Sequence, residues 1–381
     1  MTMYIGPARS PSEAESARHL AASIFGPLAG HDIHESEEFK RFLWNEPGYD
    51  VQEHIVVMAI GAGNVVGCVR LLPRHLHGHG DIFLCAGISS VCIAEEYRGS
   101  GKSHELMVIA LEQARLLGYE VTILFARRAL DYYYTRFNIW GLSSYNRVSI
   151  VVTSLKHISS AGVRLRIANN EDLPLIRQCH KSTYHDCFGY IERSDSFWLF
   201  LIHKLSQQKI ELKTILYNEQ IIGYIAMKEN VVHEFALKLN FNPVPVIKAI
   251  LPKEGELIME LPEHHNVVKS LALLDYSVSY RQCVYGGHMI GVLDKQRLIS
   301  KLAEQIKRDA KSSGIGPYHE RVDGLDLDWD GQNASVRQIG NIDKLGFATT
   351  ARLVGAQCIT GADSTRLAPG KPLNFSTLDH F

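Results

Sequence analysis

The sequence predicts an α/β fold (α+β, mixed sheet) in which one succession of strands and helices occurs twice and a smaller α/β segment follows. Three observations support this prediction. A strand, a glycine-rich turn and a helix follow one another in residues 86–117. The hairpin pattern of residues 54–72 has a counterpart at residues 214–227. The chain of 381 residues is long enough for two or three domains.

The composition is that of an ordinary globular protein without a polyionic partner. Hydrophobic residues make up 46% of the chain, charged residues make up 21%, and the net charge is −1. We therefore expect no nucleic acid partner. No run approaches 18 apolar residues and the N-terminus has no basic head, so we expect no membrane partner and no export. The seven cysteines form no CxxC pair, which favours reduced thiols and a cytoplasmic location.

The first sixty residues predict a helix, a polar region and a hairpin. Residues 11–26 have alanine and apolar residues at helical spacing between Pro11 and Gly26. Residues 29–50 are polar and mixed, and they suit either a loop or an amphipathic connecting helix. Residues 54–60 and 65–72 alternate as two strands around a glycine-rich turn.

Three histidines, His75, His77 and His79, stand at alternate positions in residues 74–81. On a strand they would share one face, which is a possible metal geometry. No cysteine or fourth histidine completes a ligand set in this segment, and its glycines favour a turn. We therefore expect an exposed loop or acceptor-edge loop here, and no metal.

The most informative stretch lies between a short apolar strand that ends at Ile93 and a helix with apolar residues at helical spacing up to Leu117. It reads Arg98-Gly99-Ser100-Gly101-Lys102-Ser103. Two glycines and two small hydroxyl side chains leave the backbone amides accessible. Because a helix N-terminus presents free N–H groups and the positive end of its dipole, this turn is an anion site. Its spacing fits neither the P-loop nor the Rossmann signature.

A second informative stretch follows the strand expected at residues 121–125. It contains Tyr132, Tyr133 and Tyr134 in succession, followed by Asn138. A tyrosine that packs by its ring and keeps its hydroxyl in water is the better interpretation for Tyr132 and Tyr133.

The remainder of the chain repeats the first succession without its glycine turn. Residues 145–152 are expected to be the closing strand of the first domain, and a second cycle begins near Val163. Pro243 and Pro245 occupy the place of the glycine turn. Because proline has no backbone N–H, a full cradle of amides is not expected there. The last segment predicts an amphipathic helix, a hairpin and helical turns, at residues 295–311, 330–333 and 342–356.

The stretch from Arg98 to Ser103 resembles motif A of the GNAT superfamily of N-acetyltransferases, Gln/Arg-x-x-Gly-x-Gly/Ala, with serine in the last place. Residues 131–139 resemble the family's Phe-Tyr-x-x-x-Gly-Phe segment. Asn138 stands at the glycine position, and asparagine tolerates the left-handed conformation. The order of the whole chain is similar to that of the enhanced-intracellular-survival, or Eis-type, acetyltransferases. This resemblance implies tandem GNAT folds: a catalytic domain at 1–155, a degenerate copy at 160–285 without its own cofactor, and a small C-terminal α/β domain at 286–381.

The resemblance implies an acyl-CoA-dependent N-acyltransferase that uses acetyl-CoA as co-substrate, acts on a small-molecule amine and is a possible homo-oligomer. The pyrophosphate would be held by Arg98, Gly99, Ser100, Gly101, Lys102 and Ser103. The pantetheine arm would be held by Val91, Cys92 and Ile93. Tyr134 falls where the family's tyrosine protonates the departing thiolate, although three consecutive tyrosines leave this register open. The resemblance also implies the carboxylate of Phe381 as base and residues 29–50 as the lining of the acceptor pocket.

Several alternatives remain at this stage. Cys92 is rejected as a nucleophile because the sequence shows no nearby His-Asp set and buried strand cysteines are commonly inert, so we expect direct attack by the amine. The acceptor could instead be a protein lysine, or an amine or hydroxyl of one natural product. A non-catalytic CoA-binding sensor is an alternative of another class, and it would not need Tyr134.

Overall fold

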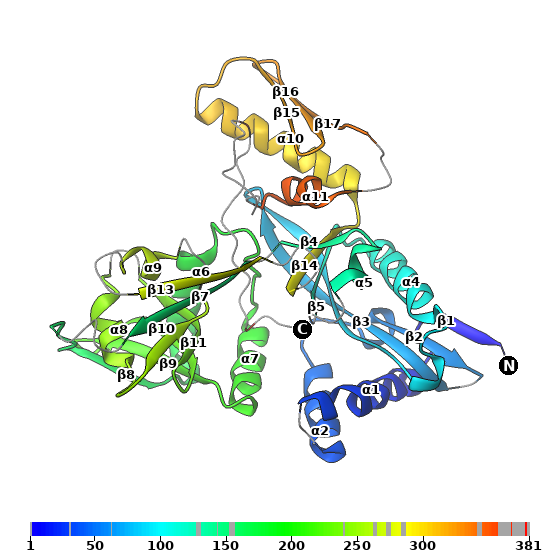
Figure 1. Ribbon diagram of the computed structural model, residues 1–381, viewed down its shortest axis with the longest axis horizontal. Coiled ribbons are helices and arrows are strands. Elements are labelled where there is room, and N and C mark those ends of the chain that lie inside the picture. Colours follow the sequence, from blue (N-terminus) through cyan, green and yellow to red (C-terminus); the bar gives the residue numbers. More distant parts are fainter. Residues whose placement is uncertain are drawn as a thin grey trace.

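The computed structural model describes residues 2–29, 32–61, 63–126, 131–142, 144–151, 157–238, 241–261, 265–271, 276–282, 287–340 and 345–356, together with Leu367 and Leu378. Within these residues the strands form two seven-stranded mixed sheets and a three-stranded sheet, with helices packed on them (Figure 1). The predicted α/β class is therefore confirmed. No helix among the described residues is both long enough and apolar enough to cross a membrane.

The first sheet has the strand order β1-β2-β3-β4-β5-β14-β6, and β4 and β5 are its parallel pair. Its strands are β1 (Met3–Pro7), β2 (Ile55–Ile60), β3 (Asn64–Gly78), β4 (Asp81–Ile93), β5 (Val121–Ala126), β6 (Ile139–Gly141) and β14 (Gly287–Val292). Its helices are α1 (Pro11–Phe25), α2 (Ile33–Trp44), α3 (Val51–His54), α4 (Lys102–Leu116) and α5 (Asp131–Thr135).

Helices cover both faces of this sheet. Alanines of α1, with Trp44 from the end of α2, pack on one face against Ile55 and Val57. Apolar residues of α4 pack on the other face against Val56 and Met58. The helix predicted at residues 11–26 is confirmed: Ser10 accepts a hydrogen bond from the Glu13 amide at its start. Residues 29–50 contain the helix α2, which begins with a capping box between Asp32 and Glu35.

The second sheet has the order β13-β7-β12-β11-β10-β9-β8, and β11 and β12 are its parallel pair. Its strands are β7 (Ser144–Val151), β8 (Val163–Ile167), β9 (Glu211–Tyr217), β10 (Gln220–Lys228), β11 (Val231–Leu237), β12 (Glu256–Met259) and β13 (Tyr276–Gln282). Its helices are α6 (Leu173–Tyr184), α7 (Asp195–Gln207), α8 (Val244–Ile250) and α9 (Asn266–Lys269).

The two sheets exchange one strand each. β7 follows β6 in the chain but lies in the second sheet, where it pairs with β12 and β13. β14 follows β13 but lies in the first sheet, where it pairs with β5 and β6. The expectation that residues 145–152 close the first sheet is therefore wrong. The alternating pattern of β7 indicates a strand, but its partners come from residues more than a hundred positions away.

The last segment packs against the end of the first sheet (Figure 1). The helix α10 (Lys295–Ser312) and the hairpin strands β16 (Leu325–Trp329) and β17 (Ala334–Gln338) lie where the sequence predicts a helix and a hairpin. β15 (Tyr318–Val322) completes the small sheet, and α11 (Phe347–Val354) follows. Their apolar side chains share one core with Leu76, Phe83 and Ile290 of the first sheet.

The histidine segment is strand rather than loop. β3 continues to Gly78 and turns into β4 at His79 and Gly80, both of which have positive φ. His79 is buried, and its Nε2 donates to the carbonyls of Arg352 and Leu353. Burial lowers the pKa of His79 to about 4. The segment therefore anchors α11 to the long hairpin.

Candidate functional site

β4 separates from β5 near the middle of the first sheet. The two strands pair in parallel register from Cys85–Val121 to Ile88–Leu124. Immediately afterwards Ser90 adopts a φ of 53°, and the register of β4 against β3 slips, which defines a β-bulge. Serine rarely adopts this left-handed conformation. Among the described residues, no strand pairs with the β5-facing edge of β4 beyond Ile88. A stretch of backbone donors and acceptors is thereby left open.

The turn after β4 exposes backbone amides. Gly99 and Gly101 have φ values of 74° and 80°, and Gly101 is the N-cap of α4. A Cβ atom on either glycine would meet nothing within 4 Å, so the conformation, and not crowding, requires glycine. Among the described residues, the amides from Gly99 to Ser103 have no acceptor. This arrangement at a helix N-terminus is suited to a phosphate.

Side chains of the same turn stabilise it through hydrogen bonds and an ion pair. Arg98 Nε donates to the carbonyl of Ile93 over 3.2 Å, and Ser100 Oγ donates to that of Tyr97 over 2.7 Å. Lys102 Nζ lies 2.8 Å from Glu105 Oε2. The predicted succession of strand, turn and helix is confirmed.

The three tyrosines have three different environments on α5. The side chain of Tyr132 is exposed, whereas Tyr134 is only 6% exposed. Tyr133 is half-buried, and its hydroxyl donates to the Ser103 carbonyl over 2.7 Å. The expectation that this hydroxyl is left in water is therefore wrong, because it ties α5 to the first turn of α4. Asn138 has the expected left-handed φ of 57°.

Tyr134 is buried, and its hydroxyl makes no hydrogen bond to another described residue. Its ring packs edge-on against Tyr133, with the ring centroids 5.0 Å apart. Burial, with a smaller contribution from Tyr133, raises the pKa of Tyr134 well above its ordinary value. The phenol therefore stays protonated at neutral pH. No hydrogen-bond partner for its hydroxyl occurs among the described residues.

Cys92 lies in a thiol pair that is poorly suited to nucleophilic attack. Its Sγ is 3.4 Å from Sγ of Cys68, directly across the β3–β4 ladder. The hydrogen bond from Cys92 and burial raise the pKa of Cys68. Among the described residues, no histidine or carboxylate contacts either thiol.

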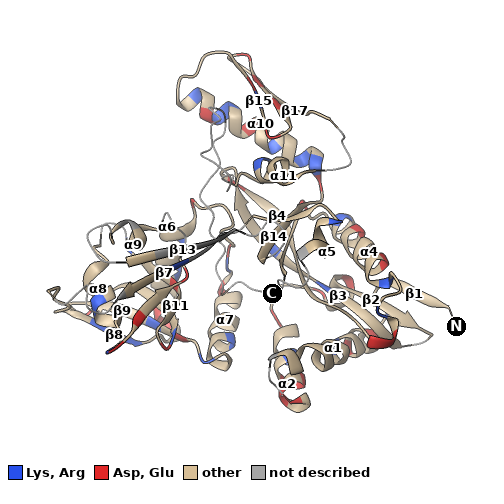
Figure 2. Ribbon diagram, in the orientation of Figure 1, with Lys and Arg blue, Asp and Glu red and all other residues tan. Residues whose placement is uncertain are grey.

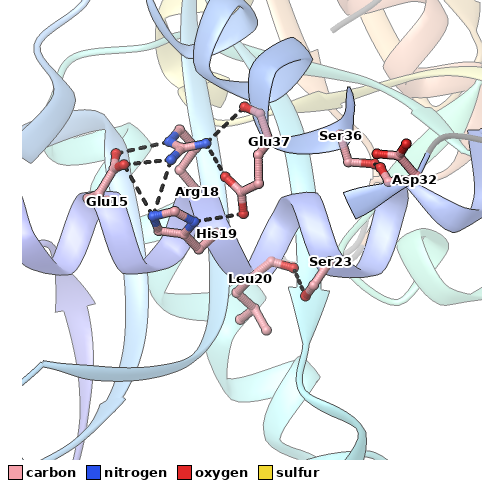
Figure 3. Close-up of polar contacts among 8 residues, drawn as sticks. All are labelled: Glu15, Arg18, His19, Leu20, Ser23, Asp32, Ser36 and Glu37. Atoms are coloured by element: carbon pink, nitrogen blue, oxygen red, sulfur yellow. Dashed lines mark hydrogen bonds and ion pairs between the residues drawn. The ribbon is translucent and has the colours of Figure 1, made fainter. Parts of the chain in front are cut away.

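α2 and α7 approach each other from opposite halves of the molecule (Figure 1). Phe42 stacks on Phe200 with ring centroids 4.8 Å apart and lies equally close to His203. α2 is also fixed to α1, because Arg18 bonds both Glu15 and Glu37 (Figure 3).

The charged residues of α1 and α2 (Figure 2) mostly take part in these contacts. Arg18 is buried, and His19 Nδ1 lies 2.7 Å from Glu37 Oε1 (Figure 3). Glu35 belongs to the capping box of α2. The acidic residues here therefore serve largely to hold the helices together.

Tyr134 shares one core with Ile88 and Ile93 of β4, and α5 is bonded to the first turn of α4 through Tyr133 and Ser103. Sequence reasoning missed the bulge at Ser90, which has no local signal, and a buried pair, Arg70 and Arg74. Charged residues on one face of an otherwise apolar strand are the signal that could have indicated the pair. Phe381 lies outside the described residues. In the part of the chain that is described, no group of three or more His, Cys, Asp or Glu side chains could hold a metal ion.

Comparison with known proteins agrees with this geometry. Residues 15–143, which include the exposed turn and α5, match the family described as an acetyltransferase (GNAT) domain. No curated protein matches the sequence.

Three solved structures resemble the whole chain. A GCN5-related N-acetyltransferase from Anabaena variabilis has 16% identity and a TM-score of 0.64, with all of both chains covered. A conserved protein from Enterococcus faecalis, described as a probable N-acyltransferase, has 14% identity and a TM-score of 0.66 with the same coverage. Eis1 from Mycobacterium abscessus has 13% identity and a TM-score of 0.62, with 99% of this chain and 100% of that chain covered. Residues 15–143 are thus similar to a GNAT acetyltransferase domain, and the whole chain has the same fold as these three structures.

Proposed function

We propose that this protein transfers the acetyl group of acetyl-CoA to the amine of a small molecule by direct attack. The observation that carries the proposal is the conjunction of a strand edge left open by the bulge at Ser90 with a run of exposed amides from Gly99 to Ser103. The amides bind the pyrophosphate by charge-assisted hydrogen bonds. The backbone of Val91, Cys92 and Ile93 binds the pantetheine arm as an added strand would.

The open edge also supplies the main catalytic stabilisation. An N–H group of β4 donates to the thioester oxygen as negative charge develops on it. One donor of this kind contributes roughly 3 kcal/mol to the stability of the transition state. The buried thiol pair of Cys68 and Cys92 supports direct attack rather than an acyl-cysteine intermediate.

Two proton transfers complete the reaction. The attacking amine loses a proton to a base, for which we propose the carboxylate of Phe381, acting through water. Tyr134 supplies a proton to the departing thiolate; its burial and protonated state support this role. Proton transfer of this kind contributes roughly 100- to 10,000-fold to the rate.

A panel of small amines incubated with acetyl-CoA, with release of free thiol as the measurement, tests the proposal. We expect thiol release that depends on the amine and a stoichiometric acetylated product. A protein-lysine acetyltransferase would instead release thiol only with peptides or proteins. Binding of acetyl-CoA without turnover on any acceptor would indicate a sensor.

The role of Phe381 needs its own test. Deleting residues 379–381 should leave acetyl-CoA affinity nearly unchanged and lower turnover by roughly 100-fold. Full activity in a protein extended by a C-terminal tag argues against this base.

A further inference from the structure

Two arginines of β3 are buried on the side of the first sheet that faces α2 and α7. The side chains of Arg70 and Arg74 are 3% and 7% exposed, and that of Glu46 is 6% exposed. Arg74 Nη1 lies 2.6 Å from Glu46 Oε1, whereas Arg70 Nη2 lies 3.5 Å from Glu46 Oε2. Among the described residues, Glu46 is the one carboxylate that pairs with Arg70. It is therefore shared by two guanidinium groups, and Arg70 is the more distant of them.

The surroundings of Arg70 leave buried donors without an acceptor. Nη2 of Arg70 donates to the Leu43 carbonyl, and the guanidinium lies over the rings of Trp44 and Tyr49. Nε of Arg70 and Nε1 of Trp44 are both buried, and neither has a hydrogen-bond partner among the described residues. Both atoms are donors only. Burial lowers the pKa of Arg70.

This cluster lies beside the place where the acceptor must approach. Arg70 is opposite Ser89 in the β3–β4 ladder, next to the bulge at Ser90. Arg74 lies over the ring of Phe197 on α7, with 5.0 Å between the guanidinium carbon and the ring centroid. The cluster therefore borders the open part of β4 on one side and the contact of α2 with α7 on the other.

We propose that Arg70, with the indole N–H of Trp44, binds a carboxylate of the acceptor, so that the substrate is an amine that also carries a carboxylate. This inference rests on the proposed acyl transfer and adds to it the chemical class of the acceptor. A guanidinium edge and a second N–H donor match the two oxygens of a carboxylate. An anion at this position would compensate the incompletely balanced charge of Arg70 and satisfy both unpartnered donors.

The test compares acceptors that differ only by a carboxylate, such as lysine with cadaverine and phenylalanine with phenethylamine. We expect kcat/KM to be about tenfold to a hundredfold higher for the carboxylated member of the pairs, as for a hydrogen-bonded charge. Arg70→Leu should remove this preference through KM, with unchanged acetyl-CoA affinity. Arg164→Gln, which removes an exposed arginine, is the matched control and should keep the preference.

Two further variants keep the test decisive if Arg70→Leu does not fold. Trp44→Phe keeps an aromatic ring and removes the N–H, and should reduce the preference a few-fold. Glu46→Gln removes the competing carboxylate, and should lower KM for carboxylated acceptors and leave the other amines unchanged.

The outcomes separate this inference from the proposed function. Thiol release that is equal for both members of each pair, or an Arg70→Leu variant that slows both members equally, would overturn the carboxylate site and leave acyl transfer intact. No thiol release with any amine would instead contradict the proposed function.

Discussion

The two large sheets follow the same plan strand by strand, yet they differ at the point where a cofactor would bind. Each has a parallel pair at its centre, and each has a register slip beside that pair, at Ser90 in β4 and between Ala226 and Met227 opposite β11. In both sheets the parallel pairing ends at this slip: at Ile88 in the first and at Val232 in the second. The separation of the strands is thus a property of the repeated fold.

What fills the separation is different. In the second sheet, Phe235 accepts hydrogen bonds at its carbonyl from His265 Nε2 at 2.9 Å and from the Tyr184 hydroxyl at 2.7 Å. The helix that follows, α8, has Pro243 as its N-cap and Pro245 in its first turn, and neither proline provides an N–H group. In the first sheet the corresponding edge is open and the turn contains Gly99 and Gly101. The comparison teaches that a strand separation is accessible to a ligand only if side chains of the protein leave it empty.

The largest expected effect concerns the glycine turn. Gly101→Glu should reduce acetyl-CoA affinity by roughly a hundredfold or more, because it places a carboxylate beside the proposed pyrophosphate site. Isothermal calorimetry measures this directly. Gly118→Glu is the matched control, since Gly118 lies at the other end of α4 with a φ of 83° and equally open surroundings. Equal loss of affinity in both variants would indicate backbone strain alone.

The next largest effect is expected for a substitution of Tyr134. Tyr134→Phe should lower kcat by roughly 100-fold or more with little change in acetyl-CoA affinity, because it removes the proposed proton donor and keeps the ring. Single-turnover measurement of thiol release checks this. Tyr132→Phe, at an exposed position of the same helix, should have no effect. Comparable losses in the two variants would remove the assigned role.

The third prediction concerns stoichiometry. Equilibrium titration should give one acetyl-CoA per chain. In the second sheet His265 already bonds the carbonyl of Phe235 at the edge of β11, and Pro243 and Pro245 replace the glycine turn. His265→Ala should not create a second site, since the prolines remain. Two molecules bound per chain would contradict the distinction between the halves.

The smallest expected effect is on acid stability. His265 Nδ1 accepts from the Val267 amide and Nε2 donates to Phe235, so the ring must be neutral. Burial lowers the pKa of His265 to about 4, from the ordinary 6.5. The contribution of neutral His265 to the free energy of unfolding is present above pH 6.5. It is lost as the pH falls towards 4, because the histidine is protonated in the unfolded state before it is protonated in the folded state. In His265→Gln the fall in Tm between pH 6.5 and pH 4 should be shallower, because unfolding of this variant takes up fewer protons, by up to about one. An unchanged slope would assign the acid sensitivity to other groups.

The sequence by itself determined the local features of this protein. The turn from Arg98 to Ser103, the start of helix α4 at Gly101 and the left-handed Asn138 follow from the backbone preferences of glycine and asparagine, which act over a few residues. The lack of amide donors at the start of α8 is equally predictable from the sequence, because it follows from Pro243 and Pro245 themselves.

Only the tertiary structure decided which segments meet. The strands β7 and β14 have ordinary strand patterns, but a pattern of period two carries no information about a distant partner, and each strand lies in the other half's sheet. The bulge at Ser90 depends on pairing across two strands. The burial of Arg70 beside Trp44 depends on α2 folding back over β3. These features need contacts between residues far apart in the chain, and such contacts form only in the folded protein.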